Sequence, residues 1–422
     1  MSMSYRSLQE VDEDVFRVIR REAEIRSSSI GLIASENWVS RAILEAQASV
    51  FNNKTAEGYP GRRYFPGCST LDEIELLAIE RAKKLFRADH ANVQPHSGTQ
   101  ANMAVYHSIL SPGDTILGMR LDQGGHLSHG YHLSFSGKIY KAFSYGVERN
   151  SETIDFVQVS RLAKEHKPKI IVAGGSAYPR TIPFEKFREA ADENGALLMA
   201  DIAHIAGLVA GEVHPNPFPH ADFVTMSTFK TLPGPRGGIA MCKSRHAKDL
   251  DRGVFPGVQG SLHAHAIVAK AVMLKEALDP TFSEYVNQVV KNARKLAEIL
   301  MQRGYRMVSG GTDTHLLLVD VSRKGLTGKA AESALEGCGI HVNRNSIPFD
   351  EKPPMMTSGI RIGTSSVTTR GMKESEMLLI GEIIDQVLSN PEDKSLIERK
   401  RSEVAELAAR FPLFVSPSSL VA

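Results

Sequence analysis

The chain has 422 residues, of which 42% are hydrophobic and 23% charged, and its formal net charge is +2. This composition is ordinary for a water-soluble globular protein of two or three domains. The small net charge gives no electrostatic basis for binding nucleic acid or an anionic membrane. No apolar run is long enough to span a bilayer, the N-terminus lacks an apolar signal core, and three widely spaced cysteines match neither a zinc nor a disulfide pattern. We therefore expect a cytoplasmic protein.

The first 60 residues are predicted to form an N-terminal arm. Residues 8–26 have the apolar spacing of an amphipathic helix. A short apolar run at 30–34 leads to the polar turn Ser35–Glu36–Asn37, which we expect to cap a helix that begins near Ser40. Residues 52–67 are rich in glycine, proline and aromatic side chains, and a loop of this length in a compact chain is usually functional.

Residues 61–285 are predicted to form a large α/β domain. Apolar strands alternate with helices through this part of the chain, which predicts a mostly parallel sheet covered on both faces. We expect helices at 71–87, from about 101 to 109, and at 184–194, and strands directly after 114 and at 170–173, 197–200 and 223–226.

Residues 286–422 are predicted to form a smaller α/β domain. A helical stretch at 265–302 carries the chain out of the large domain, and the alternating pattern then restarts. We expect strands at 314–320 and 339–343, and helices at 328–336, 372–390 and 393–411.

Three polar residues, Ser176, Asp201 and Lys230, each follow a predicted strand, and parallel α/β sheets bind ligands at the carboxyl ends of their strands. Most isolated lysines are solvated surface residues. A lysine buried at the end of a strand, however, can lose its proton by desolvation and act as a nucleophilic amine toward a carbonyl. The stretch Ser97–Gly98–Thr99 lies at a predicted helix N-terminus, where free N–H groups and the helix dipole favour a phosphate.

Together these features predict a pyridoxal-phosphate site. That chemistry requires a lysine for the aldehyde, a carboxylate for the pyridine nitrogen and an anchor for the phosphate. Each residue by itself has a more ordinary interpretation. Asp201 alone is more often a helix cap, His126 and His204 are more often structural, and Arg361 is more often an ion-pair residue, although its fork suits an amino-acid carboxylate.

Separated motifs occur along nearly the whole chain. They are LIASEN (32–37), AEGYPGRRY (56–64), QPHSGTQAN (94–102), GGHLSHG (124–130), DIAHIAGLVA (201–210), FKTLPGPRGG (229–238), FPGVQG (255–260), VNRNSIPFD (342–350), SGIRIGT (358–364) and VTTRGMKESE (367–376). Together they resemble the serine hydroxymethyltransferase family. The resemblance implies an aspartate-aminotransferase-like, fold-type-I pyridoxal-phosphate enzyme with a seven-stranded large sheet. It also implies tetrahydrofolate as co-substrate and active sites shared between two subunits of a homodimer, or of a tetramer built from such dimers.

The resemblance assigns roles to individual residues. Lys230 resembles the residue that bonds covalently to the cofactor, Asp201 the partner of the pyridine nitrogen, and His126 the residue that stacks on the ring. The remaining assignments are Ser97, Gly98, Thr99 and the neighbouring subunit's Gly260 around the phosphate; Ser176 and His204 at the phenolic oxygen and face of the cofactor; Ser35 and Arg361 at the substrate carboxylate; Glu57 as the acid–base carboxylate; and Glu57, Tyr64, Leu121, Gly125 and Asn345 at the folate.

This chain departs from the family pattern mainly around the substrate. Thr55 and Phe65 stand where the family usually has tyrosines, Phe229 stands in place of histidine, and Pro233 in place of arginine. Ser261 replaces the second of two glycines, and Trp38 is larger than the aromatic ring expected there. Because the cofactor residues are intact, the departures favour an altered substrate over a lost activity. Thr55, Phe65 and Phe229 predict a wider and less polar pocket.

Stereochemistry then suggests the substrate. In the family reaction the hydroxymethyl group of L-serine replaces the pro-S hydrogen of glycine, so a methyl group in place of the other hydrogen gives D-alanine and 2-methyl-L-serine. A buried methyl contributes only about 1 kcal/mol, so steric admission must decide the preference. The leading hypothesis is a 2-methylserine hydroxymethyltransferase that uses 5,10-methylenetetrahydrofolate.

Three alternatives remain open. The first is an ordinary serine/glycine hydroxymethyltransferase with tolerated substitutions, although the hydroxyl missing at Phe65 weighs against this. A folate-independent aldolase or threonine transaldolase is disfavoured by Glu57, Tyr64 and Asn345. A catalytically silent paralogue that binds pyridoxal phosphate is disfavoured by the intact set of charged residues.

Overall fold

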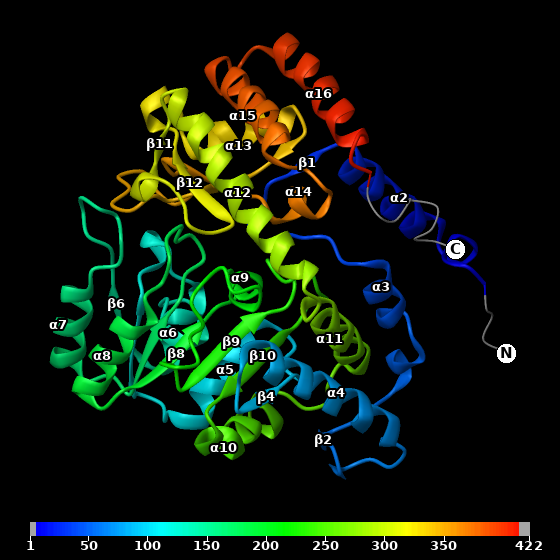
Figure 1. The fold of residues 1–422 in the computed structure, drawn as a ribbon, viewed down its shortest axis with the longest axis vertical. Coiled ribbons are helices and arrows are strands. Elements are labelled where there is room, and N and C mark those ends of the chain that lie inside the picture. The colour runs from blue at the N-terminus through cyan, green and yellow to red at the C-terminus, as the bar shows by residue number, and fades with distance from the viewer. Residues whose placement is uncertain (1–5, 413–422) are drawn as a thin grey trace.

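The computed structural model describes residues 6–412, and its largest sheet has seven strands. This sheet lies in the lower half of Figure 1. The strand order is β4-β10-β9-β8-β7-β5-β6, and β10 is antiparallel to both of its neighbours while the other strands run parallel to one another. The strands are β4 (His90–Asn92), β5 (Thr115–Met119), β6 (Lys141–Tyr145), β7 (Ile170–Ala173), β8 (Leu197–Asp201), β9 (Phe223–Ser227) and β10 (Gly238–Cys242). The predicted mostly parallel α/β fold is confirmed.

Helices cover both faces of this large sheet, and β7 and β9 are buried along their whole length. Strands that are apolar on both faces are what a covered parallel sheet requires. The helix predicted from about 101 begins earlier, at Gly98, because the hydroxyl of Ser97 caps it by accepting from the Gln100 N–H. The helices are α4 (Ser69–Phe86), α5 (Gly98–Ile109), α6 (Phe135–Ile139), α7 (Phe156–His166), α8 (Phe184–Asn194), α9 (Ala206–Ala210), α10 (Ala247–Arg252) and α11 (Ala264–Ala277).

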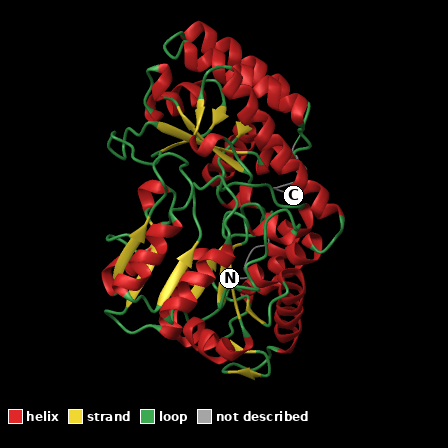
Figure 2. Ribbon diagram, turned by 60° about the vertical axis from the view of Figure 1, so that its left-hand side comes forward, coloured by secondary structure: helices red, strands yellow, loops and turns green. Residues whose placement is uncertain are grey.

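A second, four-stranded antiparallel sheet lies above the first, and each sheet has its own helices (Figure 2). Its order is β11-β12-β15-β14. Its strands and helices are β11 (Arg306–Met307), β12 (Leu316–Asp320), β14 (Asn343–Asn345), β15 (Gly359–Gly363), α12 (Thr281–Gln302), α13 (Gly328–Gly337), α14 (Ser365–Thr369), α15 (Glu374–Ser389) and α16 (Lys394–Ala409).

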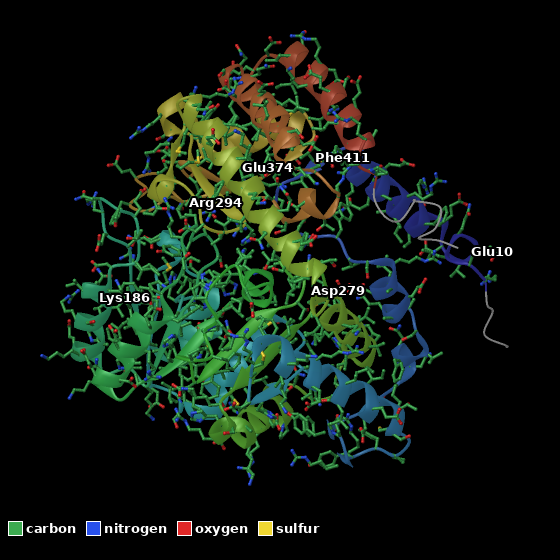
Figure 3. The ribbon with its side chains drawn as sticks, in the orientation of Figure 1. Glu10, Lys186, Asp279, Arg294, Glu374 and Phe411 are labelled. Atoms are coloured by element: carbon green, nitrogen blue, oxygen red, sulfur yellow. The ribbon has the colours of Figure 1, made fainter. Side chains whose placement is uncertain are left out.

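The helical stretch predicted at 265–302 is interrupted between α11 and α12. Pro280 lacks the N–H that a continuous helix would need at this point, and α12 starts directly after it. Asp279 marks the connection in Figure 3. From there α12 runs from the large sheet to the small one (Figure 1), where its apolar face joins the core of the small sheet.

The predicted strand 339–343 is wrong as a single element. Its first part, β13 (Ile340–His341), pairs with β1 (Ile30–Gly31) from the N-terminal segment, whereas Asn343 begins β14 and pairs with Arg361. The apolar run near residue 30 is buried in the core of the small sheet. There β1 pairs with β13, so β13 is not part of the four-stranded sheet.

The N-terminal segment contains α1 (Leu8–Val11), α2 (Glu13–Ser27) and α3 (Arg41–Gln47), followed by the short hairpin of β2 (Gly58–Tyr59) and β3 (Arg62–Arg63). Asp12 separates the first two helices by capping α2. The expectation that Ser35–Asn37 caps α3 is wrong, because the hydroxyl of Ser40 accepts from the Ile43 N–H. None of the helices within residues 6–412 is long and apolar enough to cross a membrane.

Candidate active site

A cavity of about 130 Å³ opens at the carboxyl ends of the strands of the large sheet. This is the edge at which a parallel α/β sheet presents loop residues to a ligand. The cavity brings together nine of the residues that the sequence singled out. Its lining consists of Ser97, Gly98, Thr99, His126, His129, Gly175, Ser176, Asp201, Ala203, His204, Ser227, Phe229 and Lys230.

Asp201, the last residue of β8, is a buried carboxylate held by three donors. Oδ2 accepts from His129 Nε2 at 2.9 Å and from Asn102 Nδ2 at 2.8 Å, and Oδ1 accepts from the Ala203 N–H at 3.0 Å. Burial opposes ionisation, but the hydrogen bond from His129, the electrostatic effect of His129 and His126, and the hydrogen bond from Asn102 together outweigh it and lower the pKa of Asp201. The site therefore contains a fixed negative charge that can hold a protonated ring nitrogen.

Lys230 follows β9 by three residues and is only 9% exposed. Burial lowers the pKa of Lys230 to about 8, against the opposing effect of the Asp201 carboxylate. Its main chain is held by Asn37, whose Nδ2 donates to the Lys230 carbonyl oxygen at 2.8 Å. The side-chain amine is thus partly neutral near pH 8, as a nucleophile toward a carbonyl requires. The main chain that carries it is held in place by Asn37.

The first turn of α5 lies against β9 and β10. A Cβ atom on Gly98 would lie 3.3 Å from Ser227 Cβ, and one on Gly238 would lie 2.3 Å from the carbonyl oxygen of Ser97. The glycines therefore let the helix start approach the strand ends. The first N–H groups of a helix have no partner within the helix, and here they border the cavity, so they are available to a phosphate.

Two histidines in the cavity wall are kept neutral. Burial lowers the pKa of His126 to about 4, and its Nδ1 accepts from the Ser128 N–H at 3.2 Å. Burial also lowers the pKa of His204 well below its ordinary value, and its Nδ1 lies 3.4 Å from Nε2 of His315. Neutral rings can pack against a flat cofactor without adding positive charge to the site.

Arg361, on β15 of the small sheet, is hydrogen-bonded to Ser176 in the cavity wall. Its Nη1 donates to the Ser176 carbonyl oxygen at 2.6 Å and its Nε to Asn343 Oδ1 at 3.1 Å. Burial lowers the pKa of Arg361 to about 10, so it remains protonated near neutral pH. The two sheets therefore place a cation beside the cavity, where a substrate carboxylate can bind.

Other predicted residues lie near this cavity without lining it. Ser35 lines an adjacent hollow of about 170 Å³ together with Phe229, which borders both spaces. Gly125 follows Gly124, whose carbonyl oxygen accepts from the Ser176 N–H at 2.7 Å, and Leu121 lies three residues before Gly124. Asn345 lies on β14, paired with Gly359.

The remaining predicted residues form a second cluster, made of Thr55, Glu57, Tyr64, Phe65 and Gly260. A Cβ atom on Gly260 would lie 3.5 Å from Glu57 Oε1. The side chains of Tyr64 and Phe65 are 74% and 42% exposed. Among the described residues that line the Lys230 cavity, none comes from this cluster. One chain thus presents the predicted site residues as two separate groups.

A buried ion-pair network fixes the loop of the second cluster. Arg63 donates from Nε to Asp72 at 2.7 Å, from Nη2 to Glu75 at 2.5 Å and from Nη1 to the Gly58 carbonyl oxygen at 2.7 Å. Gln94, close to the start of α5, also donates to Glu75, at 2.7 Å. The loop is therefore built as a rigid, outward-facing element.

Sequence reasoning missed three residues that position the predicted ones: His129, Asn102 and Asn37. Two signals were present. His129 lies three residues after His126, and Asn102 lies one helical turn after Gly98, on the same face of α5. Asn37 carried no signal of its own, because its bond to the Lys230 carbonyl joins segments 193 positions apart.

The observed groups fit pyridoxal phosphate. A buried carboxylate that stays ionised, a lysine of lowered pKa and a set of free helix N–H groups are the three anchors that this cofactor needs. A family model described as serine hydroxymethyltransferase matches residues 8–384, which include both sheets and every predicted site residue. The chain therefore belongs to the serine hydroxymethyltransferase family, the fold-type-I pyridoxal-phosphate enzymes that transfer one-carbon units with tetrahydrofolate.

Proposed function

We propose that this enzyme interconverts 2-methylserine and D-alanine, with tetrahydrofolate as the one-carbon carrier. In the direction of cleavage, the bond between the α-carbon and the hydroxymethyl carbon breaks. The one-carbon unit passes at the oxidation level of formaldehyde to tetrahydrofolate, and water is released. The carrying observation is that Thr55, Phe65 and Phe229 replace bulkier or more polar family residues in a chain whose cofactor anchors are intact.

The cofactor anchors have distinct tasks in this proposal. When bound, pyridoxal phosphate supplies an electron sink for the negative charge that develops at the α-carbon of the amino acid. Lys230 would hold the aldehyde end, the N–H groups of Ser97–Thr99 would hold the phosphate, and Asp201 would keep the ring nitrogen protonated. His129 and Asn102 maintain the charge of Asp201 through their hydrogen bonds.

Further residues are proposed to bind the amino acid and the folate beside the cofactor. Arg361 would hold the amino-acid carboxylate, with Ser35 beside it, and its position next to Ser176 supports this role. Glu57 would move the proton of the hydroxymethyl group, and Tyr64, Leu121, Gly125 and Asn345 would contact the folate. Phe229 borders both hollows beside Lys230, where its ring supplies an apolar wall in place of the polar histidine of the family. The guanidinium carbon of Arg236 lies 4.0 Å from the centroid of this ring and holds it in place.

The second cluster completes the site in our proposal only when two chains associate. Its outward-facing loop, fixed by Arg63, is suited to reach the Lys230 cavity of a neighbouring subunit. We therefore infer a homodimer with two shared sites. Mixing an inactive Lys230→Ala variant with an inactive Glu57→Gln variant should restore activity through one intact site in the mixed dimer. No recovery in demonstrated mixed dimers would contradict shared sites.

The deciding experiment measures folate-dependent cleavage of 2-methyl-L-serine and L-serine at equal concentration on the cofactor-loaded enzyme. A clear preference for the methylated substrate supports the proposal. A preference for L-serine makes the enzyme an ordinary serine hydroxymethyltransferase. Thr55→Tyr should narrow the pocket and abolish turnover of D-alanine while retaining glycine, and unchanged D-alanine turnover in that variant would refute the role of Thr55.

A further inference from the structure

Lys270, on α11, is a fully buried lysine that the reaction does not use, with only 1% of its surface exposed. Its Nζ donates to three main-chain carbonyl oxygens: Val93 at 2.6 Å, Gly238 at 2.9 Å and Pro95 at 3.0 Å. None of the ion pairs among residues 6–412 includes Lys270, and the Glu75 carboxylate that attracts it electrostatically is paired with Arg63. Burial lowers the pKa of Lys270 to about 7, and in its charged form each of the three N–H donors of the ammonium group meets a carbonyl oxygen. Because burying a lysine is costly, such a site calls for an explanation.

The three carbonyl groups belong to the two segments that hold the opposite ends of the cofactor. Val93 and Pro95 lead into Ser97–Thr99, the phosphate anchor. Gly238 begins β10, at the end of the loop that follows Lys230. The two segments also meet directly, since the Gly238 N–H donates to the Pro95 carbonyl oxygen at 3.0 Å.

The stem of Lys270 also fits closely below these segments. A Cβ atom on Gly237 would lie 2.5 Å from Lys270 Cε, so the loop and the lysine are packed with no room for a larger residue. One side chain therefore clamps the loop after Lys230 to the loop before α5. The neighbouring contact from Gln259 Nε2 to the Gln94 carbonyl oxygen, at 2.9 Å, supports the same segment from another side.

We propose that Lys270 is a positioning residue that sets the spacing between the phosphate anchor and Lys230. A ligand held at both ends gains affinity from the second anchor only when the spacing of the anchors matches its own length. Removing the Lys270 side chain should therefore lower the affinity for a ligand that binds both anchors. The affinity for a ligand that binds only one anchor should change little. This inference rests on the assignment of the two anchors made under the proposed function.

The test compares three ligands on the apoenzyme: pyridoxal phosphate, which engages both anchors, and inorganic phosphate and pyridoxal, which engage one each. In Lys270→Met we expect the affinity for pyridoxal phosphate to fall about tenfold or more, and the affinities for phosphate and pyridoxal to change by less than about threefold. Lys275→Met, an exposed lysine on the same helix, is the matched control and should behave as wild type.

Two results would overturn the proposal. Unchanged affinity for pyridoxal phosphate would show that the clamp is not needed. An equal loss for inorganic phosphate would make Lys270 a local support of the phosphate anchor and not a spacer. Wild-type apoenzyme that fails to bind pyridoxal or phosphate would instead refute the anchor assignment itself. Binding of these two ligands does not depend on which amino acid is the substrate, so the test is independent of the proposed substrate.

A second variant guards against misfolding. Lys270→Ala leaves space beside three carbonyl oxygens that an added methylammonium ion can fill. We expect methylammonium to restore the affinity for pyridoxal phosphate, and tetramethylammonium, which has no N–H donor, to have no effect. Equal effects of both ions, or no rescue, would contradict the proposal. If neither variant folds even with methylammonium, Lys270 serves the whole fold and the spacing role is rejected.

Discussion

The guanidinium of Arg361 donates a 2.6 Å hydrogen bond from Nη1 to the main-chain carbonyl oxygen of Ser176. This bond connects the small sheet to the strand-end loop of the large sheet, across 185 positions of sequence. Its consequence is that the proposed carboxylate-binding cation is oriented by the wall of the cofactor cavity before any substrate arrives. Preorganisation of this kind reduces the entropic cost of binding.

Arg361→Lys should therefore weaken amino-acid binding selectively. A lysine retains the charge but loses the planar fork that can bond Ser176 and a carboxylate together. We expect KM for the amino acid to rise about tenfold or more, with cofactor affinity unchanged. Steady-state kinetics and cofactor titration would measure both. Arg294→Lys, on the exposed face of α12 (Figure 3), is the control. An unchanged KM would exclude Arg361 from the substrate site.

His129→Phe should impair the enzyme through Asp201. The substitution removes the 2.9 Å hydrogen bond that helps keep this buried carboxylate ionised, so the pKa of Asp201 rises. We expect activity to fall roughly tenfold and the acid limb of the pH–activity profile to move to higher pH. A pH profile of kcat would detect the shift. His132→Phe, an exposed neighbour, should leave the profile in place. A uniform loss with no displacement of the acid limb would indicate a purely structural role.

The pH dependence of cofactor uptake should follow Lys230. Only the neutral amine is a nucleophile, and burial lowers the pKa of Lys230 to about 8. Below that pH most of the amine is protonated and unreactive, and above it the neutral form predominates. The rate at which the apoenzyme captures pyridoxal phosphate should therefore rise with pH, with a midpoint near 8, and then level off. Stopped-flow absorbance would follow it. A midpoint near the ordinary lysine value would contradict the effect of burial.

Gly238→Ala should damage the phosphate anchor. The added methyl group would lie 2.3 Å from the Ser97 carbonyl oxygen. Because this oxygen belongs to the main chain, it cannot easily move away to relieve the clash. We expect a loss of about 1–3 kcal/mol in the free energy of unfolding, together with weaker binding of pyridoxal phosphate. Urea unfolding and cofactor titration measure the two effects. Gly31→Ala is the control, because its Cβ would make an ordinary 3.5 Å contact with Ser366 Oγ. Equal behaviour of the two variants would argue against the close approach at Gly238.

The sequence by itself determined the fold class and the cofactor chemistry. Apolar strands closed or followed by Ser176, Asp201 and Lys230 predict a covered parallel sheet. Because the carboxyl ends of parallel strands share one edge of the sheet, these residues had to meet. The same local signals placed helix α8 at its observed bounds, Phe184–Asn194. Such predictions succeed because they depend on periodicity and on residues adjacent in the chain.

Only the tertiary structure decided the contacts between distant segments. The split of the predicted strand 339–343, the bonds of His129 to Asp201 and of Asn37 to Lys230, and the burial of Lys270 all depend on pairings across many residues. A lysine on a helix gives no sign in sequence of whether water or three carbonyl oxygens will surround its amine. The environment of a polar group is set by what packs around it, and packing of distant segments has no local signature.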